Sequence, residues 1–416
     1  MLLSRPTGYS KLRKQTDRAV SVASAMIRIV YDGTIFTSQT SGGISRYFCK
    51  LIEEMARIRP DWTFDLHIVE DGREPARLPA GDNIQITRRR HFRPGWFWSP
   101  INYANRQFKI RNAQPAILHS TLARPFSFCP CPLVTTIHDA IIEKLPEFYA
   151  HRSHARAKRW WRWSAQRADA VLTVSRTSRT DILDIWAPPP SKVHVTYPGV
   201  EEAFKDAGFE KTSDVSSRFA VKRPYLLYVG HRGEHKNFQV LAEAIKDSAV
   251  EDLDLVLVGG ADRVPELEGW SGVKRNRLHH LKRITDSELR SLYSGTVALV
   301  FPSLYEGFGF PLVEAMSCGA PVVSSDIPSS REVCGDAAEF FQPRDPADCV
   351  KAILRVQDQK KRESLIGSGI ERAKLFNWSS CANETIRVYE ELIAVWSSKA
   401  TRDHASPRSN SWESLT

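Results

Sequence analysis

The sequence lacks several features that would place it at once in a broad class. No stretch of its 416 residues approaches the ~18 consecutive apolar residues of a membrane-spanning helix. Residues 1–25 are basic and rich in serine and arginine, without the apolar centre of a secretory signal. No Gly-x-Gly-x-x-Gly follows an expected strand, which disfavours a dinucleotide-dependent oxidoreductase or epimerase, an alternative that NAD binding would decide.

Cysteine is scarce and scattered as well. The seven cysteines are an odd number, and Cys129 and Cys131 have no second pair that would complete a zinc site. Isolated thiols are typical of a reduced compartment, so we expect a cytoplasmic protein. The single Asp-x-Asp, at Asp252 and Asp254, leads into an expected strand and suits its solvated edge better than a metal. We therefore expect no metal site.

What the chain does contain is positive charge and room for two domains. It has 58 basic and 48 acidic residues, a net charge of +10. Such an excess suits phosphorylated ligands, an anionic membrane surface or nucleic acid. With 42% hydrophobic and 25% charged residues, the composition is that of a folded protein. A length of 416 residues accommodates two domains of ordinary size.

Short apolar runs alternate with helical patterns along the chain, which is typical of parallel βαβ units. One helix is expected in "GGISRYFCKLIEEMARI" and another in "TDSELRSLYSG", with Thr285 or Asp286 as its N-cap. We therefore predict an α/β fold with two tandem Rossmann-like parallel-sheet domains that face a cleft. The expected strands are 26–32, 116–119, 133–138, 170–175, 193–197, 225–230, 253–260, 297–303 and 320–326.

Changes in periodicity divide the chain. Between residues 200 and 222 the helical and strand patterns fade while glycine, serine and charge increase, so we place the domain boundary there. The predicted segments are a flexible extension (1–25), a first domain (26–205), a linker (206–222), a second domain (223–377), an amphipathic helix (378–398) and a disordered tail (399–416).

The stretch "FPSLYEGFGFPLVEAMSCGAPVVSSD", residues 301–326, contains the strongest local signal. Its glycines let backbone approach a ligand, and a glycine loop that leads into a helix N-terminus is an anion site that suits a diphosphate. Glu306 and Glu314 would repel phosphate, but their carboxylates can accept hydrogen bonds from sugar hydroxyls. A diphosphate together with a diol is the outline of a nucleotide sugar.

Three further motifs lie at expected strand or helix ends. "YVGHRGEHKNF" places Arg232 and Lys236 between a strand and a helix, where two cations suit a diphosphate. "SGGISRYF" places Gly42 and Gly43 at the start of a helix, and "TTIHDA" places His138 at a strand end. The carboxyl ends of both sheets would bring these motifs to one cleft.

Together these motifs resemble the retaining glycosyltransferases of family 4, which have the GT-B fold. "YEGFGFPLVEAM" is similar to the family's E-x7-E signature, and "VGHRGEHKNF", "GGISRYF", "TVS" at 173–175 and "PGV" at 198–200 are also similar. The resemblance covers about 26–398. It implies an acceptor-side first domain, a nucleotide-sugar-binding second domain, and a terminal helix that crosses back to the first domain.

The resemblance also implies roles for individual residues. Arg232 and Lys236 would hold the diphosphate and stabilise the departing nucleotide. Glu306 would hold the hydroxyls of the transferred sugar, and His138 would contact that sugar near its anomeric carbon. Glu314 would bind the ribose diol. The implied donor-binding set is Gly42, Gly43, Arg283, Ile284, Gly307, Phe308, Gly309, Phe310, Leu312 and Glu314.

The activity implied is transfer of a hexose, with mannose as the first expectation, to a polysaccharide, lipopolysaccharide or lipid-linked glycan with retention of anomeric configuration. Positioning and electrostatic stabilisation of the leaving group would drive the reaction, so no cofactor and no metal are required. The alternatives are the dinucleotide enzyme considered above and a non-catalytic basic membrane adaptor.

Residues 151–167 form a basic and aromatic segment without an acidic residue. On a helix, Arg152, Arg156, Arg159 and Arg162 share one side, which is either a solvated face or a contact with an anionic membrane or a lipid-linked acceptor. A peripheral position on the inner face of the membrane is therefore possible. Because no nucleic-acid-binding signature accompanies the segment, we expect no nucleic-acid partner.

Overall fold

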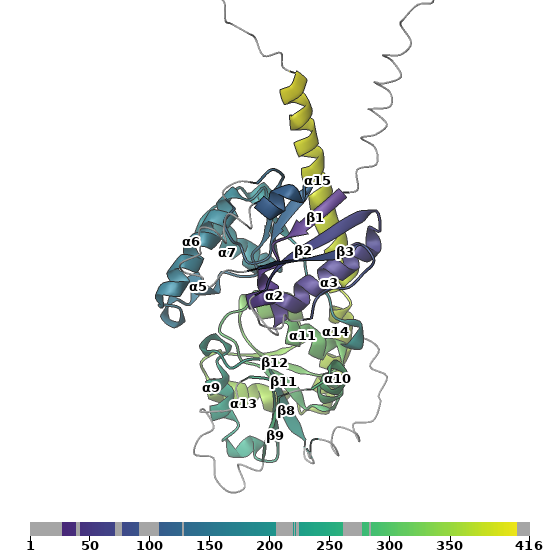
Figure 1. The fold of residues 1–416 in the computed structure, drawn as a ribbon. Coiled ribbons are helices and arrows are strands. Elements are labelled where there is room, and N and C mark those ends of the chain that lie inside the picture. The colour runs from purple at the N-terminus through teal and green to yellow at the C-terminus, as the bar shows by residue number, and fades with distance from the viewer. Residues whose placement is uncertain are drawn as a thin grey trace, which may run out of the picture.

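The computed structural model describes residues 27–38, 42–70, 77–90, 108–126, 129–204, 219, 221, 224–260, 277–282 and 284–405. This part of the chain forms two lobes, one above the other in Figure 1, and each is built on a parallel sheet. The predicted extension 1–25, most of the predicted linker 206–222 and Arg283 lie outside the described residues.

The first sheet has seven parallel strands in the order β3-β2-β1-β4-β5-β6-β7. The order reverses between β1 and β4, where Ile29 pairs with Ile117, and such a reversal opens a ligand-binding crevice at the carboxyl ends of the strands. The strands are β1 (Ile27–Tyr31), β2 (Trp62–Glu70), β3 (Ile84–Arg90), β4 (Ile117–Ser120), β5 (Leu133–Thr136), β6 (Ala170–Thr173) and β7 (Val193–Val195).

The second sheet has six parallel strands in the order β10-β9-β8-β11-β12-β13, again with a reversal, here between β8 and β11. Every described residue of β9 and β11 is buried, as expected for strands covered by helices on both faces. The strands are β8 (Tyr225–Val229), β9 (Asp254–Val258), β10 (Leu278–Leu281), β11 (Ala298–Phe301), β12 (Val322–Ser325) and β13 (Glu339–Phe341).

Helices cover both sheets. The helices of the first lobe are α2 (Thr34–Ser38), α3 (Gly43–Ile58), α5 (Ile141–Lys144), α6 (Arg152–Arg167) and α7 (Arg176–Trp186). Those that follow are α9 (Phe238–Ala244), α10 (Asp286–Gly295), α11 (Phe310–Ser317), α12 (Pro328–Cys334), α13 (Pro346–Arg355), α14 (Gln359–Ala373) and α15 (Trp378–Ala405). Short 3-10 helices are η2 (Pro146–Phe148), η3 (Pro190–Lys192), η4 (Glu202–Phe204), η5 (Glu234–Lys236) and η6 (Ser248–Val250).

Helix α15 leaves the second lobe and packs against α3 of the first, as the yellow ribbon of Figure 1 shows. At its start, the ring of Trp378 lies 5.8 Å from Tyr47 of α3 and stacks 6.4 Å from Phe310 of α11. Further along, the hydroxyl of Tyr389 hydrogen-bonds Tyr31 of β1 at 3.0 Å inside the protein. The last helix therefore contributes to the core of the first lobe.

The predicted fold class, two tandem parallel-sheet α/β domains, is confirmed. Thr285 is the N-cap of α10 and forms a capping box with Glu288. The sequence did not predict four of the strands, namely β2, β3, β10 and β13. Strand β2 places Asp65 and His67 inside the protein, 3.1 Å apart, and such buried polar pairs interrupt the apolar runs by which a strand is recognised. Helix α15 ends at Ala405, beyond the expected 398.

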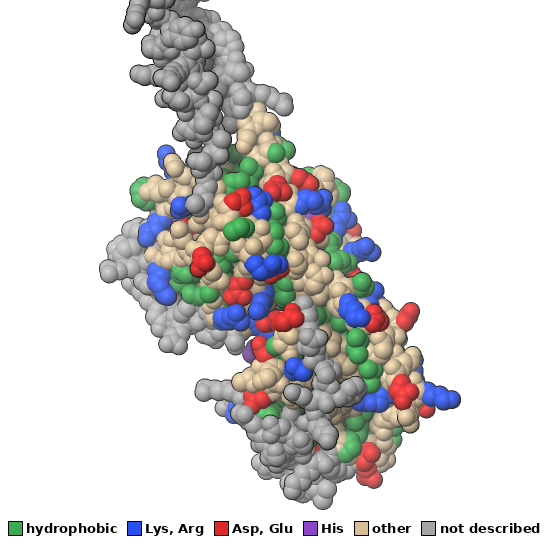
Figure 2. Space-filling model, turned by 90° about the vertical axis from the view of Figure 1, so that its right-hand side faces the viewer, with side chains coloured by type: hydrophobic (Ala, Val, Ile, Leu, Met, Phe, Trp, Pro, Cys, Tyr) green, Lys and Arg blue, Asp and Glu red, His purple; other side chains and the backbone are tan. Residues whose placement is uncertain are grey.

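Charge is mixed on the surface that Figure 2 shows. Acidic and basic side chains of the described residues are interspersed over this face, so the positive excess of the sequence does not gather there. Among the described residues, no helix combines the length and the apolar character that crossing a bilayer requires.

Candidate active site

The loop after β11 carries Glu306, the first glutamate of the E-x7-E block, and leads into α11, which carries Glu314. Gly309, the N-cap of α11, has φ +101°, a conformation that side chains other than glycine rarely adopt. Pro311 occupies the first turn, where its missing N–H costs nothing. Gly319, with φ +70°, follows the helix end. The local sequence therefore forces a tight loop and a short helix, as expected.

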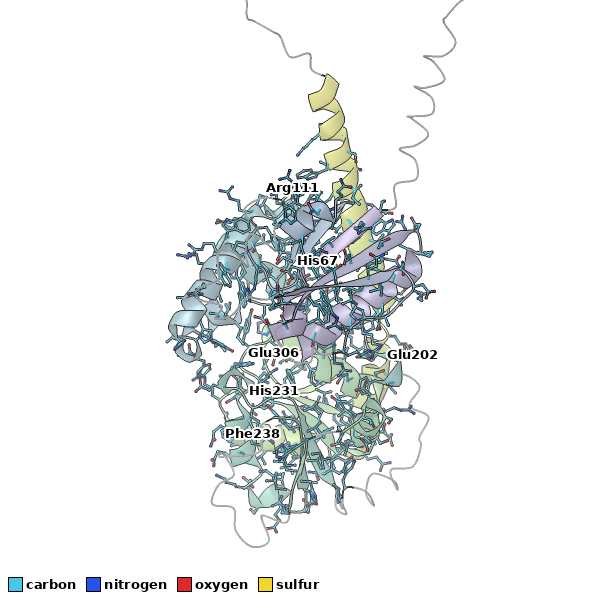
Figure 3. The ribbon with its side chains drawn as sticks, viewed as in Figure 1. His67, Arg111, Glu202, His231, Phe238 and Glu306 are labelled. Carbon is cyan, nitrogen blue, oxygen red and sulfur yellow. The ribbon has the colours of Figure 1, made fainter. Side chains whose placement is uncertain are left out.

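Glu306 lies in this loop, where the two lobes meet (Figure 3). Its Oε1 atom accepts hydrogen bonds from Lys236 Nζ at 2.6 Å and from Ser303 Oγ at 2.7 Å. Lys236 ends η5, which follows β8, so the strand-to-helix loop and the E-x7-E loop meet through this ion pair. Lys236 and Glu306 lie together at one place, as the sequence predicted. In this structure, however, the ammonium group of Lys236 pairs with Glu306.

Glu314 lies on α11, and its side chain is buried. Its Oε2 accepts a hydrogen bond from Tyr293 of α10 at 2.9 Å, and its Oε1 is 3.8 Å from Arg46 Nη1 of α3. Burial raises the pKa of this carboxyl, while Arg46 and the tyrosine hydroxyl oppose the increase. Arg46 also pairs with Glu201 at 2.7 Å and with Asp286 at 3.8 Å, so it shares its charge among three carboxylates. Glu314 is thus a buried acceptor beside a cation of the other lobe.

His138 follows β5 in the first lobe. Its ring lies edge-on to Tyr47 at 4.9 Å and to Phe48 at 5.9 Å. Its Nε2 atom is buried and has no hydrogen-bond partner among the described residues. Burial lowers the pKa of His138 to about 4, so the imidazole is neutral near pH 7. A neutral ring with a buried, unpartnered nitrogen can hydrogen-bond a ligand hydroxyl.

The E-x7-E loop lies directly against the first lobe. A Cβ atom on Gly307 would be 2.4 Å from the carbonyl oxygen of His138, so only glycine allows this approach. Ser175 Oγ donates to the Gly307 carbonyl oxygen at 2.6 Å, and Ser178 Oγ donates to that of His138 at 2.8 Å. The two hydroxyls at the start of α7 thus hold the loops of both lobes together.

The glycine motif at the start of α3 also lies close to the second lobe, while its predicted contact with donor phosphates stays a prediction. Gly43 begins α3, after Gly42, and a Cβ atom on Gly43 would lie 3.5 Å from Phe310 Cδ2. The side chains of Phe308 and Leu312, in contrast, are buried in the core. Only the backbone groups of these two residues could therefore contact a ligand. The structure therefore brings the glycine motif of the first lobe to the loop of the second.

Arg232 and Ile284 were also predicted to bind the donor. Arg232 Nη1 is 3.4 Å from the carbonyl oxygen of Gly259, at the end of β9, and its guanidinium lies 5.9 Å from the Phe238 ring centroid. His231 and Phe238 mark this region in Figure 3, below Glu306. Ile284 packs, partly buried, against the core, and its role in donor binding stays a prediction.

Several contributors were not singled out in the sequence. Arg46 stands inside "GGISRYF", and Tyr305 directly precedes Glu306, so both residues belong to motifs that the sequence shows. Tyr305 OH accepts a hydrogen bond from the Ala140 N–H at 3.1 Å and donates to Asp181 Oδ2 at 2.8 Å. Asp181 has no such local signal. Over the described ranges, no cluster of three or more histidine, cysteine or acidic side chains could hold a metal ion.

Comparison with known proteins agrees with this geometry. The family model described as "Glycosyltransferase Family 4" matches residues 41–204, and that described as "Glycosyl transferases group 1" matches 209–372. The chain is similar to O-antigen chain mannosyltransferase B of Escherichia coli, with 30% identity over 275 residues that cover 62% of this chain and 70% of the relative.

Solved structures share the fold. A sucrose-phosphate synthase from Thermosynechococcus elongatus superposes with a TM-score of 0.72 at 20% identity, covering 89% of this chain and all of that one. Anabaena Alr3699/HepE, solved in complex with UDP-glucose, gives 0.68 at 17% identity, covering 88% of this chain and 100% of that one. Two facing parallel-sheet domains with the motif loops between them define a GT-B glycosyltransferase. The chain belongs to glycosyltransferase family 4.

Proposed function

We propose that this glycosyltransferase moves a hexose from a nucleotide diphosphate sugar to a glycan or lipid-linked acceptor, with retention of anomeric configuration. One observation carries the proposal: the Glu306 loop lies against His138 of the other lobe, and the start of α11, which carries Glu314, lies against Gly43. Carboxylates, glycine backbone, a cation and a neutral imidazole thus surround one place between two domains. This combination suits a diphosphate joined to a sugar.

Mannose is the proposed sugar. The E. coli relative is named a mannosyltransferase of the O-antigen chain, and 70% of its length is covered by this chain. The Anabaena structure contains UDP-glucose, which supports a nucleotide diphosphate as the donor class. We therefore propose a nucleotide-bound mannose as donor and a polysaccharide, lipopolysaccharide or lipid-linked glycan as acceptor.

In the proposed reaction, the acceptor hydroxyl attacks the anomeric carbon from the face that the nucleotide leaves. The new C–O bond forms as the bond to the phosphate oxygen breaks, and the departing diphosphate takes the hydroxyl proton. Lys236 and Arg232 stabilise the negative charge that grows on the diphosphate. Glu306 exchanges its contact with Lys236 for sugar hydroxyls, and neutral His138 orients the same sugar. No residue needs to act as a covalent nucleophile.

Replacing Glu314 by glutamine tests the donor site. Glutamine keeps the acceptor for Tyr293 but removes the charge beside Arg46, so the ribose diol loses its carboxylate partner. We expect donor turnover to fall about 100-fold or more, with an unchanged melting temperature. Glu371→Gln is the control, because Glu371 pairs with Lys374 on the exposed face of α14. Full activity in Glu314→Gln would contradict the assignment.

A thermal-shift screen identifies the donor base. We expect one of GDP, UDP and ADP to raise the melting temperature more than the others, since a ligand that binds only the folded state stabilises it by mass action. The corresponding sugar nucleotides then rank the hexoses, with the mannose donor expected first. No protection by any of the three diphosphates would overturn the proposed function.

We further propose that α6 contacts an anionic membrane surface. Arg156, Arg159 and Arg162 are exposed, while Trp161 packs inward, 6.2 Å from Trp186. Reversing the three arginines to glutamate should release the protein from phosphatidylglycerol vesicles. Reversing three exposed lysines of the second lobe (Lys246, Lys351 and Lys360) provides a charge-matched control. Equal vesicle binding by both triple variants would remove this contact from the proposal.

A further inference from the structure

Arg46 extends from α3 of the first lobe to a carboxylate of the second. Its Nη1 atom lies 3.8 Å from Glu314 Oε1, which is within ion-pair distance but too long for a hydrogen bond. The other oxygen of this carboxylate, Oε2, accepts the hydroxyl of Tyr293 at 2.9 Å. We propose that Arg46 is a second ligand of the donor ribose, so that both lobes recognise the nucleoside. The inference rests on the proposed function and adds a contact from the first lobe to the Glu314 site.

The guanidinium of Arg46 is oriented by Glu201. Arg46 Nε donates to Glu201 Oε1 at 2.8 Å, and Nη2 lies 2.7 Å from the same oxygen atom. Glu201 directly follows the "PGV" motif, whose Gly199 packs against the start of α15. A Cβ atom on Gly199 would lie only 2.2 Å from the backbone nitrogen of Trp378. Because this backbone is anchored, Glu201 holds two nitrogens of the guanidinium and leaves Nη1 directed at Glu314.

The gap between Arg46 and Glu314 fits one hydroxyl group. A hydroxyl can donate to a carboxylate and accept from a guanidinium at the same time. Hydrogen bonds of about 2.8 Å to each partner can meet at one oxygen atom when the partners are 3.8 Å apart. The ribose of a nucleotide presents two neighbouring hydroxyls, one of which would take this bridging position.

The charges around Arg46 favour an uncharged hydroxyl over a phosphate. Three carboxylates lie near the guanidinium, with Glu201 at 2.7 Å and both Asp286 and Glu314 at 3.8 Å. A phosphate would meet all three, and like charges repel. Burial raises the pKa of Glu314, and Glu201 and Asp286 act in the same direction, whereas Arg46 lowers it. Arg46 thus favours the ionised carboxylate, which accepts hydrogen bonds from a diol.

Removing the guanidinium tests the inference. Arg46→Met and Arg46→Gln both remove it, and they are judged by the same criterion, so one folded variant suffices. Lys50→Met is the matched control, because Lys50 lies on the same helix and pairs with Glu201 and Glu53 instead of Glu314. The Kd values of GDP, UDP and ADP are measured by calorimetry for each protein. The 2′,3′-dideoxy analogues, which lack both ribose hydroxyls, are measured in parallel.

We expect each Arg46 variant to raise the Kd of the diphosphate that wild type binds most tightly at least 10-fold, because a hydrogen bond to a charged group contributes about that much to affinity. The Kd of its dideoxy analogue should stay within 2-fold, and Lys50→Met should match wild type with both ligands. Equal losses for the two ligands would show that Arg46 only joins the lobes, and an unchanged Kd of the ribose form would equally overturn the contact. A wild-type protein that binds none of the three diphosphates would instead overturn the proposed function.

Discussion

Two buried histidines near the cleft are held in the neutral form. His119 is fully buried, and its ring nitrogens contact the hydroxyl of Tyr389 at 2.5 Å and that of Thr136 at 2.8 Å. Burial lowers the pKa of His119 to about 3 and that of His138 to about 4. Hydroxyls can serve a neutral imidazole as donor or acceptor, so both rings are suited to hydrogen bonding without carrying charge.

These pKa values predict a loss of stability in acid. Between pH 6.5 and about pH 4, unfolded chains bind protons on both histidines that the folded protein does not bind, so the free energy of unfolding falls as the pH decreases. Each histidine contributes a slope of at most about 1.4 kcal/mol per pH unit. The stability is fully present above pH 6.5.

Urea titrations of wild type and His119→Gln, measured from pH 7 to pH 4.5, test the predicted fall in the free energy of unfolding. Glutamine keeps a donor and an acceptor for the two hydroxyls but does not titrate, so the variant should show a shallower pH dependence, whatever its stability at pH 7. Parallel curves for the two proteins would show that His119 binds its proton in the folded state.

At the scale of one element, the E-x7-E loop depends on glycine for the approach of the two lobes. Gly307→Ala would place a methyl group 2.4 Å from the His138 carbonyl oxygen, which is backbone and cannot rotate away as a flexible side chain could. We expect kcat to fall about 100-fold, since a displacement near 1 Å in an active site can cost that much. Nucleotide protection should persist, because Arg232, Lys236 and Glu314, which are proposed to hold the diphosphate and the ribose, all belong to the second lobe.

Gly367→Ala provides the control for this substitution. Gly367 lies inside α14, and a Cβ atom there would meet nothing within 4 Å. Alanine should therefore stabilise the helix by about 0.5–1 kcal/mol and leave kcat unchanged. If Gly307→Ala retains wild-type kcat as well, the close approach of loop and His138 is not needed for turnover.

At the scale of the whole molecule, Glu332 of the second lobe joins the start of α7 in the first. Its carboxylate accepts two backbone N–H groups, the Thr177 hydroxyl at 2.6 Å and the Tyr197 hydroxyl at 2.7 Å. A carboxylate at a helix N-terminus is stabilised by the free N–H groups and the helix dipole, by about 0.3–1 kcal/mol when exposed and up to ~2 kcal/mol when partly buried. This contact holds the two lobes together.

Glu332→Ala should loosen the closed arrangement. We expect faster hydrogen–deuterium exchange at the amides of Arg176 and Thr177 and a larger radius of gyration by small-angle scattering. Glu371→Ala is the matched control, because its pair with Lys374 is exposed and worth about 0–1 kcal/mol. Equal exchange at α7 in both variants would show that the contact does not hold the lobes.

The sequence by itself determined the class of fold and the local shape of the site. Alternation of apolar runs and helical patterns predicts parallel βαβ units because each element buries one side. Gly309 and Pro311 dictate a tight loop and a short helix through their own backbone geometry, and Glu306 and Glu314 are carried along at set spacing. The fold class and the local shape of the site depend on residues that are close together in the sequence, so the sequence alone predicts them.

Only the tertiary structure decided which partners these residues meet. Arg46 reaches Glu314, Glu332 reaches the start of α7, and a cavity beside Glu306 exists because α7 and α12 face each other. Such contacts join residues of different lobes and depend on how two finished domains dock. Periodicity and spacing describe each domain's own packing, and the docking angle that creates the site is not a local property of either.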